Sequence, residues 1–222
     1  MWPPRTIVVT DRRRLSCGSS DDAASALVAF AAAVAAAGVD VVQIRERDWD
    51  DGTLVRVTRA VMRATAGSGC EVFVNERAHV AVAAGAHGMH LRGNGMPAAR
   101  VRAAWPTGLR IGRSVHGSDQ ATVADGVDVA LFGTVFPSVS KGGDAVIAGV
   151  AALAAWVGIA GATPVVAIGG IDVERCAAVR AAGACGVAGI DVFVRAWEQG
   201  GAALAALVRE MHAVLGERER TQ

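Results

Sequence analysis

The feature that most constrains this chain is a repeated pattern in which a β-branched run ends in charged, imidazole or glycine residues. It occurs at 41–47 (VVQIRER), 72–77 (VFVNER), 111–116 (IGRSVH) and 164–170 (PVVAIGG). Strands that are apolar throughout and polar at their C-terminal tips are typical of a parallel sheet covered by helices, with a site where the strands end. The pattern therefore predicts an enzyme or a small-ligand binder.

A weak internal repeat gives the order of the elements. At 37–41, 84–89, 125–129 and 182–187 a glycine comes just before an apolar run, as when a helix closes on a C′ glycine and a short loop leads into a strand. The expected strands lie near 6–10, 39–44, 71–75, 88–91, 110–115, 129–135, 164–168 and 186–190. About eight βα units in 222 residues match an α/β fold with a single (β/α)8 TIM barrel, one domain over residues 1–222. A flavodoxin-like open sheet is the alternative, but it has fewer strands than the sequence predicts.

Composition limits the partners. Lys plus Arg number 22 against 21 for Asp plus Glu, which gives no support to nucleic-acid binding. The first five residues lack the apolar core of a signal peptide, and the Ala-rich segment 24–38 is expected to be a covered helix. We expect a cytoplasmic protein that binds neither nucleic acid nor membrane.

The glycine-rich ends of the last two expected strands predict a phosphate site. Glycines let backbone N–H groups approach an anion, and the helices that follow supply partial positive charge at their N-termini. The candidate phosphate ligands are Gly169, Gly170, Gly189 and Ile190. Glycines that only make tight turns are the alternative. Asp191 would repel a phosphate dianion unless it points away or meets a cation.

Six motifs, in order, resemble those of the thiamine phosphate synthase and TenI superfamily. They are QIRER (43–47), NER (75–77), GMHL (88–91), IGRSVH (111–116), FGTVF (132–136) and VVAIGGI (165–171). The resemblance runs from about Val8 to the eighth expected strand. It implies a (β/α)8 barrel, usually a homodimer, that binds the phosphorylated thiazole half of thiamine.

The resemblance implies two possible chemistries, and we expect the first, that of a TenI-like thiazole tautomerase. This isomerase aromatises a thiazole carboxylate phosphate, and the IGRSVH motif resembles it closely. His116 would carry the ring proton to the exocyclic carbon, which requires neither metal nor cofactor. The expected catalytic residues are His116, Arg45 and Lys141. The expected substrate-binding residues are Gln43, Arg47, Asn75, Arg113, Ser114, Ser138 and Ser140.

The alternative chemistry is that of a Mg2+-dependent thiamine phosphate synthase, which joins hydroxymethylpyrimidine pyrophosphate to thiazole phosphate. Such synthases hold Mg2+ with aspartates after strands three and four. Here Glu76 stands at the first position, and the second falls near Gly95, where there is no carboxylate. Because Mg2+ prefers oxygen ligands with carboxylate charge, this counts against the synthase. In its favour, Gln43, Arg45 and the loop 138–141 resemble the synthase's contacts, and Arg47 keeps the charge of a common lysine.

A second alternative is a non-catalytic regulator that binds a thiazole or thiamine phosphate. It would keep the glycine site and lose the acid–base group. Retention of His116 together with Arg45 and Lys141 favours catalysis, since site chemistry rather than fold decides function.

Overall fold

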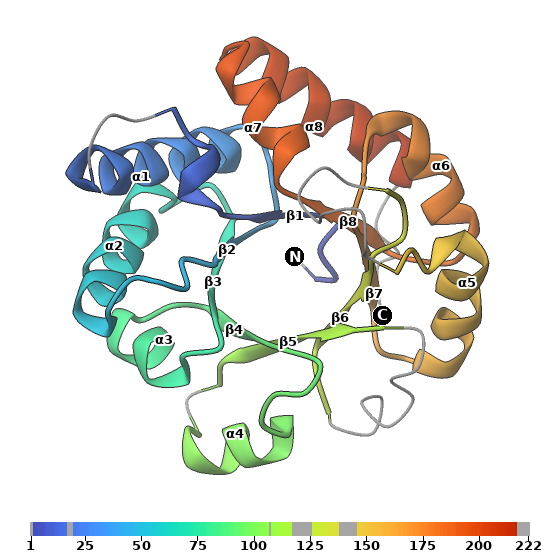
Figure 1. Ribbon diagram of the computed structural model, residues 1–222, viewed down its shortest axis with the longest axis horizontal. Helices are drawn as coiled ribbons and strands as arrows, with labels where there is room; N and C mark the ends of the chain where they lie inside the picture. Colours follow the sequence, from blue (N-terminus) through green and yellow to red (C-terminus); the bar gives the residue numbers. More distant parts are fainter. Residues whose placement is uncertain (1, 17–19, 107, 117–125, 138–145, 217–222) are drawn as a thin grey trace.

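The computed structural model describes residues 2–16, 20–106, 108–116, 126–137 and 146–216, which form a closed barrel of parallel strands in sequence order (Figure 1). The strands are β1 Thr6–Val9, β2 Val41–Ile44, β3 Glu71–Asn75, β4 Gly88–Leu91, β5 Arg110–Val115, β6 Val129–Gly133, β7 Val165–Ile168 and β8 Gly186–Gly189. β1 pairs with β8 through Ile7 and Ala188, which closes the sheet. The TIM barrel is thus confirmed, and the open flavodoxin-like sheet is wrong.

Helices surround the barrel on the outside (Figure 1). They are α1 Ser20–Ala36, α2 Asp51–Ala64, α3 Ala78–Ala84, α4 Ala98–Ala104, α5 Gly149–Ala160, α6 Val173–Ala181, α7 Asp191–Glu198 and α8 Gly201–Leu215, with a 3-10 turn η1 at Arg12–Arg14. Two helices begin at capping aspartates, because Asp50 accepts from Thr53 N and Asp172 from Arg175 N, each at 2.9 Å. α3 ends on Gly85 with a φ of 73°, as the glycine repeat predicts.

The sixth strand is shorter than the sequence predicts. The expected run 129–135 ends as a strand at Gly133, although Val135 N still donates to Ile168 O at 3.0 Å. Gly133, Thr134 and Pro137, at the end of this strand and just after it, line the mouth of the barrel.

The barrel interior is filled by side chains and is closed at the end where the strands begin. Alternate strand residues pack inside, and these are Ile7, Val9, Val41, Phe73, Val129, Leu131, Val166 and Ala188. Trp2 stacks on Phe73 with ring centroids 6.2 Å apart, and the Arg110 guanidinium lies 4.4 Å from the Trp2 ring. In Figure 1 the N-terminal segment accordingly lies within the ring of strands. A ligand site is left to the opposite, C-terminal end.

No helix among the described residues combines the length and the apolar character needed to cross a bilayer.

Candidate active site

A cavity of about 900 Å³ opens at the C-terminal end of the barrel. Every strand contributes a lining residue, and these are Val9, Gln43, Asn75, His90, Ser114, Leu131, Ile168 and Gly189. Because parallel strands all end on the same side, residues far apart in sequence converge here. The volume suits a small-molecule substrate.

Two hydrogen-bonded pairs form a polar floor to this cavity. Gln43 Nε2 donates to Asn75 Oδ1 at 3.0 Å, and His90 Nε2 lies 2.9 Å from Ser114 Oγ. Burial, with the positive charges of Arg113 and Arg45, lowers the pKa of His90 to about 3. His90 is therefore a neutral imidazole at physiological pH, suited to hydrogen bonding.

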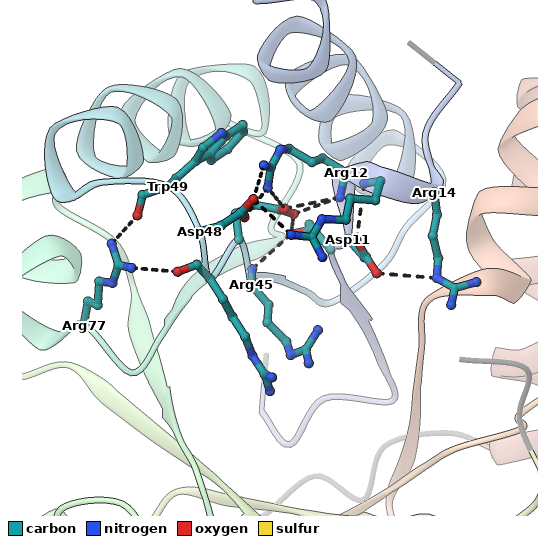
Figure 2. A network of polar contacts seen from close by, with 11 residues as sticks. Asp11, Arg12, Arg14, Arg45, Asp48, Trp49 and Arg77 are labelled. Carbon is teal, nitrogen blue, oxygen red and sulfur yellow. Dashed lines mark hydrogen bonds and ion pairs between the residues drawn. The ribbon is translucent and has the colours of Figure 1, made fainter. Parts of the chain in front are cut away.

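The loop after β2 is fastened from two sides (Figure 2). On one side Arg12 binds the buried Glu46, with Nη1 3.0 Å from Oε2, and binds Asp48 through both terminal nitrogens at 2.6 Å. On the other side Arg77 donates to the carbonyl oxygens of Trp49 at 2.6 Å and Arg47 at 3.0 Å. The loop is thus held in one shape before any substrate binds.

Arg45 and Arg47 extend from this fastened loop and line the cavity. Within the described part of the chain, neither guanidinium has a hydrogen bond or an ion pair. Burial and the like charge of Arg47 lower the pKa of Arg45. Two neighbouring guanidinium groups that no carboxylate of the described residues contacts are suited to binding a phosphate or pyrophosphate group.

Each carboxylate that lines the cavity is in an ion pair with an arginine. Among the described residues these pairs are Glu46 and Asp48 with Arg12, Asp11 and Asp191 with Arg14, and Asp172 with Arg175. The shortest contact to Asp191 is 2.6 Å, from Arg14 Nη1. The expected conflict between Asp191 and a phosphate is therefore removed by a cation.

The glycine turns after β7 and β8 lie along another part of the same cavity. Gly169 and Gly170 have φ values of 103° and 61°, which favour glycine. A Cβ on Gly170 would collide with the carbonyl of Pro137. Gly189 and Ile190 line the cavity just before α7 begins. These glycines are needed for tight turns, and the same turns leave their backbone along the cavity. Phosphate binding there stays a prediction.

His116 and Arg113, which carry the tautomerase hypothesis, have different surroundings. His116 lines the cavity, and its Nδ1 donates to the carbonyl oxygen of Gly133. Arg113 is 1% exposed and is not among the lining residues. Its guanidinium instead donates to backbone carbonyls of the loop after β4. Lys141, Ser138 and Ser140 lie outside the described residues.

The expected metal ligand Glu76 does not face the cavity as a free carboxylate. Its Oε1 lies 2.5 Å from Arg92 Nε, and Glu76 is not among the lining residues. In the described ranges no group of three or more His, Cys, Asp or Glu side chains could hold a metal ion. These residues do not fit a Mg2+ held between two carboxylates.

The arginines that follow β1 are not among the site residues that the sequence predicts. Arg12 and Arg13 line the cavity, and Arg14 pairs with Asp191. The signal was present, since this run stands directly after the first strand, as the other site clusters stand after theirs. Arg92 and Arg175, in the loop after β4 and at the start of α6, were also missed.

The fold and site define a TIM-barrel protein with an arginine-rich cavity at the C-terminal mouth of its barrel. Residues 14–193 match the family model described as thiamine monophosphate synthase, and the chain belongs to this family. A thiamine-phosphate synthase of Methanoculleus marisnigri is 40% identical over 163 residues, 72% of this chain and 76% of that one. The Laribacter hongkongensis thiamine-phosphate synthase is 34% identical over 203 residues, 90% of each chain. Among solved structures, the Pyrococcus furiosus thiamine phosphate pyrophosphorylase has a TM-score of 0.75, 25% identity and 95% coverage of both chains.

These relatives overturn the tautomerase hypothesis. Those at 34–40% identity carry the name thiamine-phosphate synthase, so the chain is an enzyme of that family, and neither an isomerase nor a non-catalytic regulator is supported. The error has a physical origin in two residues. Arg113 was interpreted as a substrate contact, whereas it is buried against backbone carbonyls. The absence of a carboxylate at Gly95 counts against a synthase only when the arginines around the mouth are left out of account.

Proposed function

We propose that this protein is a thiamine-phosphate synthase, a transferase that joins hydroxymethylpyrimidine pyrophosphate to thiazole phosphate. The names of its relatives at up to 40% identity support this assignment. The observation that carries it is that one cavity has two separate corners whose groups are suited to anions. One is the guanidinium pair after β2, and the other is formed by the glycine turns after β7 and β8. A reaction between two phosphorylated substrates needs both.

The proposed reaction is a substitution at the methylene carbon of the pyrimidine. The thiazole nitrogen forms the new C–N bond with its lone pair, the C–O bond to pyrophosphate breaks, and its electrons leave with pyrophosphate. Arg45 and Arg47 would stabilise the charge that develops on this leaving group. Because the attacking nitrogen carries no proton, the step needs no general base.

The remaining cavity residues would orient the two rings. Gln43 and Asn75, joined by their hydrogen bond, present amide groups to the pyrimidine. Ser114 and the neutral His90 present a hydroxyl and an imidazole from the neighbouring strands. The glycine corner would bind the phosphate of the thiazole. Lys141, Ser138 and Ser140 stay proposed pyrophosphate contacts on the strength of the motif resemblance alone.

The resemblance also implies Mg2+ for a synthase. Glu76 is tied to Arg92 and position 95 is glycine, so we assign no step to a metal held by the protein's own side chains.

Three further proposals concern the domain organisation, the oligomeric state and the cellular location. One domain over residues 1–222 is supported by the single closed barrel. A homodimer follows from the resemblance and is testable by light scattering. A cytoplasmic location stays a prediction from the sequence.

Incubation of the purified protein with both substrates tests the proposed function. Product identification by mass spectrometry should give thiamine phosphate, and omission of either substrate should prevent its formation. If the protein instead aromatised thiazole carboxylate phosphate and formed no thiamine phosphate, the proposal would be wrong.

A further inference from the structure

The loop between β4 and α4 presents a cation where the second of two metal-binding carboxylates is expected. Arg92, Gly93 and Asn94 line the cavity, and position 95 is glycine. The one carboxylate nearby, Glu76, lies 2.5 Å from the Arg92 Nε and is not a lining residue. The ion pair neutralises Glu76, which would otherwise repel an anionic substrate.

The shape of this loop is set by the buried Arg113 on β5. Its Nη1 donates to the carbonyl oxygens of Arg92 and Gly93, each at 3.2 Å, and its Nη2 donates to that of Met96 at 2.6 Å. A buried guanidinium that satisfies three carbonyls fixes the backbone from which Arg92 projects. The position of the Arg92 backbone at the mouth of the barrel is therefore part of the fold.

The Arg92 side chain is 61% exposed, and its ion pair with Glu76 uses the Nε hydrogen. Among the described residues, no acceptor is found for its two terminal nitrogens. Two parallel N–H groups of a guanidinium match the oxygens of a phosphate group, and the charge of arginine does not depend on pH in the physiological range. Arg92 thus has donors available on the side of the cavity.

We propose that the Arg92 guanidinium supplies the positive charge that a Mg2+ held between two carboxylates would supply, so that the protein binds a pyrophosphate group without a metal ligated by its own side chains. The inference rests on the proposed synthase function, because it names how the leaving group of that reaction is held. With Arg45 and Arg47 on the loop after β2, it makes the pyrophosphate corner a set of guanidinium groups.

Calorimetry with inorganic pyrophosphate, in EDTA and then in Mg2+, tests the inference without relying on turnover. The wild-type protein should bind pyrophosphate in EDTA, and Mg2+ should not tighten the binding. Arg92→Ala should weaken binding in EDTA by about tenfold or more, as expected for the loss of a charge-assisted contact. Arg100→Ala is the matched control, because Arg100 is an exposed arginine on α4 that does not line the cavity. It should bind as the wild type does.

A second variant separates the two roles of Glu76 by the sign of its effect. If Glu76 only pairs with Arg92, Glu76→Gln should keep or tighten pyrophosphate binding in EDTA, because it removes a negative charge. If Glu76 is a metal ligand, the same change should abolish a Mg2+-dependent gain in affinity.

Three outcomes would overturn the inference: pyrophosphate bound only with Mg2+, an Arg92→Ala protein that binds like the wild type, or a Mg2+-dependent gain lost in Glu76→Gln. These are distinct from failure of the proposed function. A protein that makes thiamine phosphate but binds pyrophosphate only with Mg2+ would refute the inference alone. A protein that binds pyrophosphate in EDTA and makes no thiamine phosphate would refute the function.

Discussion

At the scale of single residues, the site is distinguished by which charges are paired and which are not. The carboxylates of Glu46 and Asp48 are bound by Arg12, and these contacts hold the pKa of Asp48 well below its usual range. Arg45 and Arg47 project from the loop that these pairs fasten. Their positive charge is thus left for a ligand, which makes them the residues on which the proposed transfer depends most.

Arg45→Ala should lower kcat/KM for thiamine phosphate formation by about two to three orders of magnitude, the usual effect of removing one donor that stabilises developing negative charge. Steady-state kinetics measures this. Arg209→Ala, at an exposed arginine of α8 away from the cavity, is the control and should be neutral. A drop in kcat/KM of less than about threefold in Arg45→Ala would show that Arg45 does not stabilise the pyrophosphate.

At the scale of elements, the loops after the strands are held by buried or half-buried arginines. Arg77 fastens the loop after β2, and Arg113 fastens the loop after β4. Each donates to backbone carbonyls, which helps to give the loop a fixed shape. The mouth is consequently preorganised by residues that do not need to touch the substrate.

Arg113→Leu should destabilise the protein by about 1–3 kcal/mol, because it removes the buried guanidinium that donates to the part-buried carbonyls of Arg92, Gly93 and Met96. It should also weaken pyrophosphate binding, since the loop that carries Arg92 loses its anchor. Urea unfolding and calorimetry measure the two effects. Unchanged stability together with lost affinity would instead mark Arg113 as a direct substrate contact, as the sequence alone predicts.

Gly170→Ala should weaken the binding of thiazole phosphate by about tenfold or more, because the added Cβ collides with the Pro137 carbonyl and a φ of 61° disfavours alanine. Calorimetry with thiazole phosphate gives the affinity. Gly158→Ala is the matched control, since Gly158 lies in α5 with open space around its Cβ position. Equal affinities in the two variants would count against a phosphate site at the glycine turns.

At the scale of the whole molecule, the barrel brings distant segments together, and this decides what the sequence could predict. The β-branched runs predict the strands and the barrel because a strand's pattern is local. The ion pair between Arg14 and Asp191 spans 177 residues, so no local pattern predicts it. Arg113 is a second example. Its motif is visible in the sequence, but its contacts with the carbonyls of the loop after β4 depend on the folded structure.

The buried His90 makes the stability of the whole molecule depend on pH. An unfolded histidine binds a proton near pH 6.5, whereas His90 in the folded protein does so only near its pKa of about 3. Between these values the unfolded state binds more protons, so stability falls as pH is lowered below about 6.5. At pH 5 the loss from His90 should be about 2 kcal/mol.

Chemical denaturation at pH 7 and pH 5 measures the loss in the wild type, to which His212 also contributes because burial lowers its pKa to about 4. His90→Gln should remove the share that belongs to His90. His79→Gln, at an exposed histidine on α3, should keep it. An equal loss in wild type and His90→Gln would show that His90 is not held neutral by burial.

The most direct test of the assignment as a transferase is the stoichiometry of its products. With hydroxymethylpyrimidine pyrophosphate and thiazole phosphate together, the protein should release one pyrophosphate for each thiamine phosphate formed, and it should release none without thiazole phosphate. Pyrophosphate release that is independent of thiazole phosphate, or the absence of thiamine phosphate with both substrates present, would contradict it.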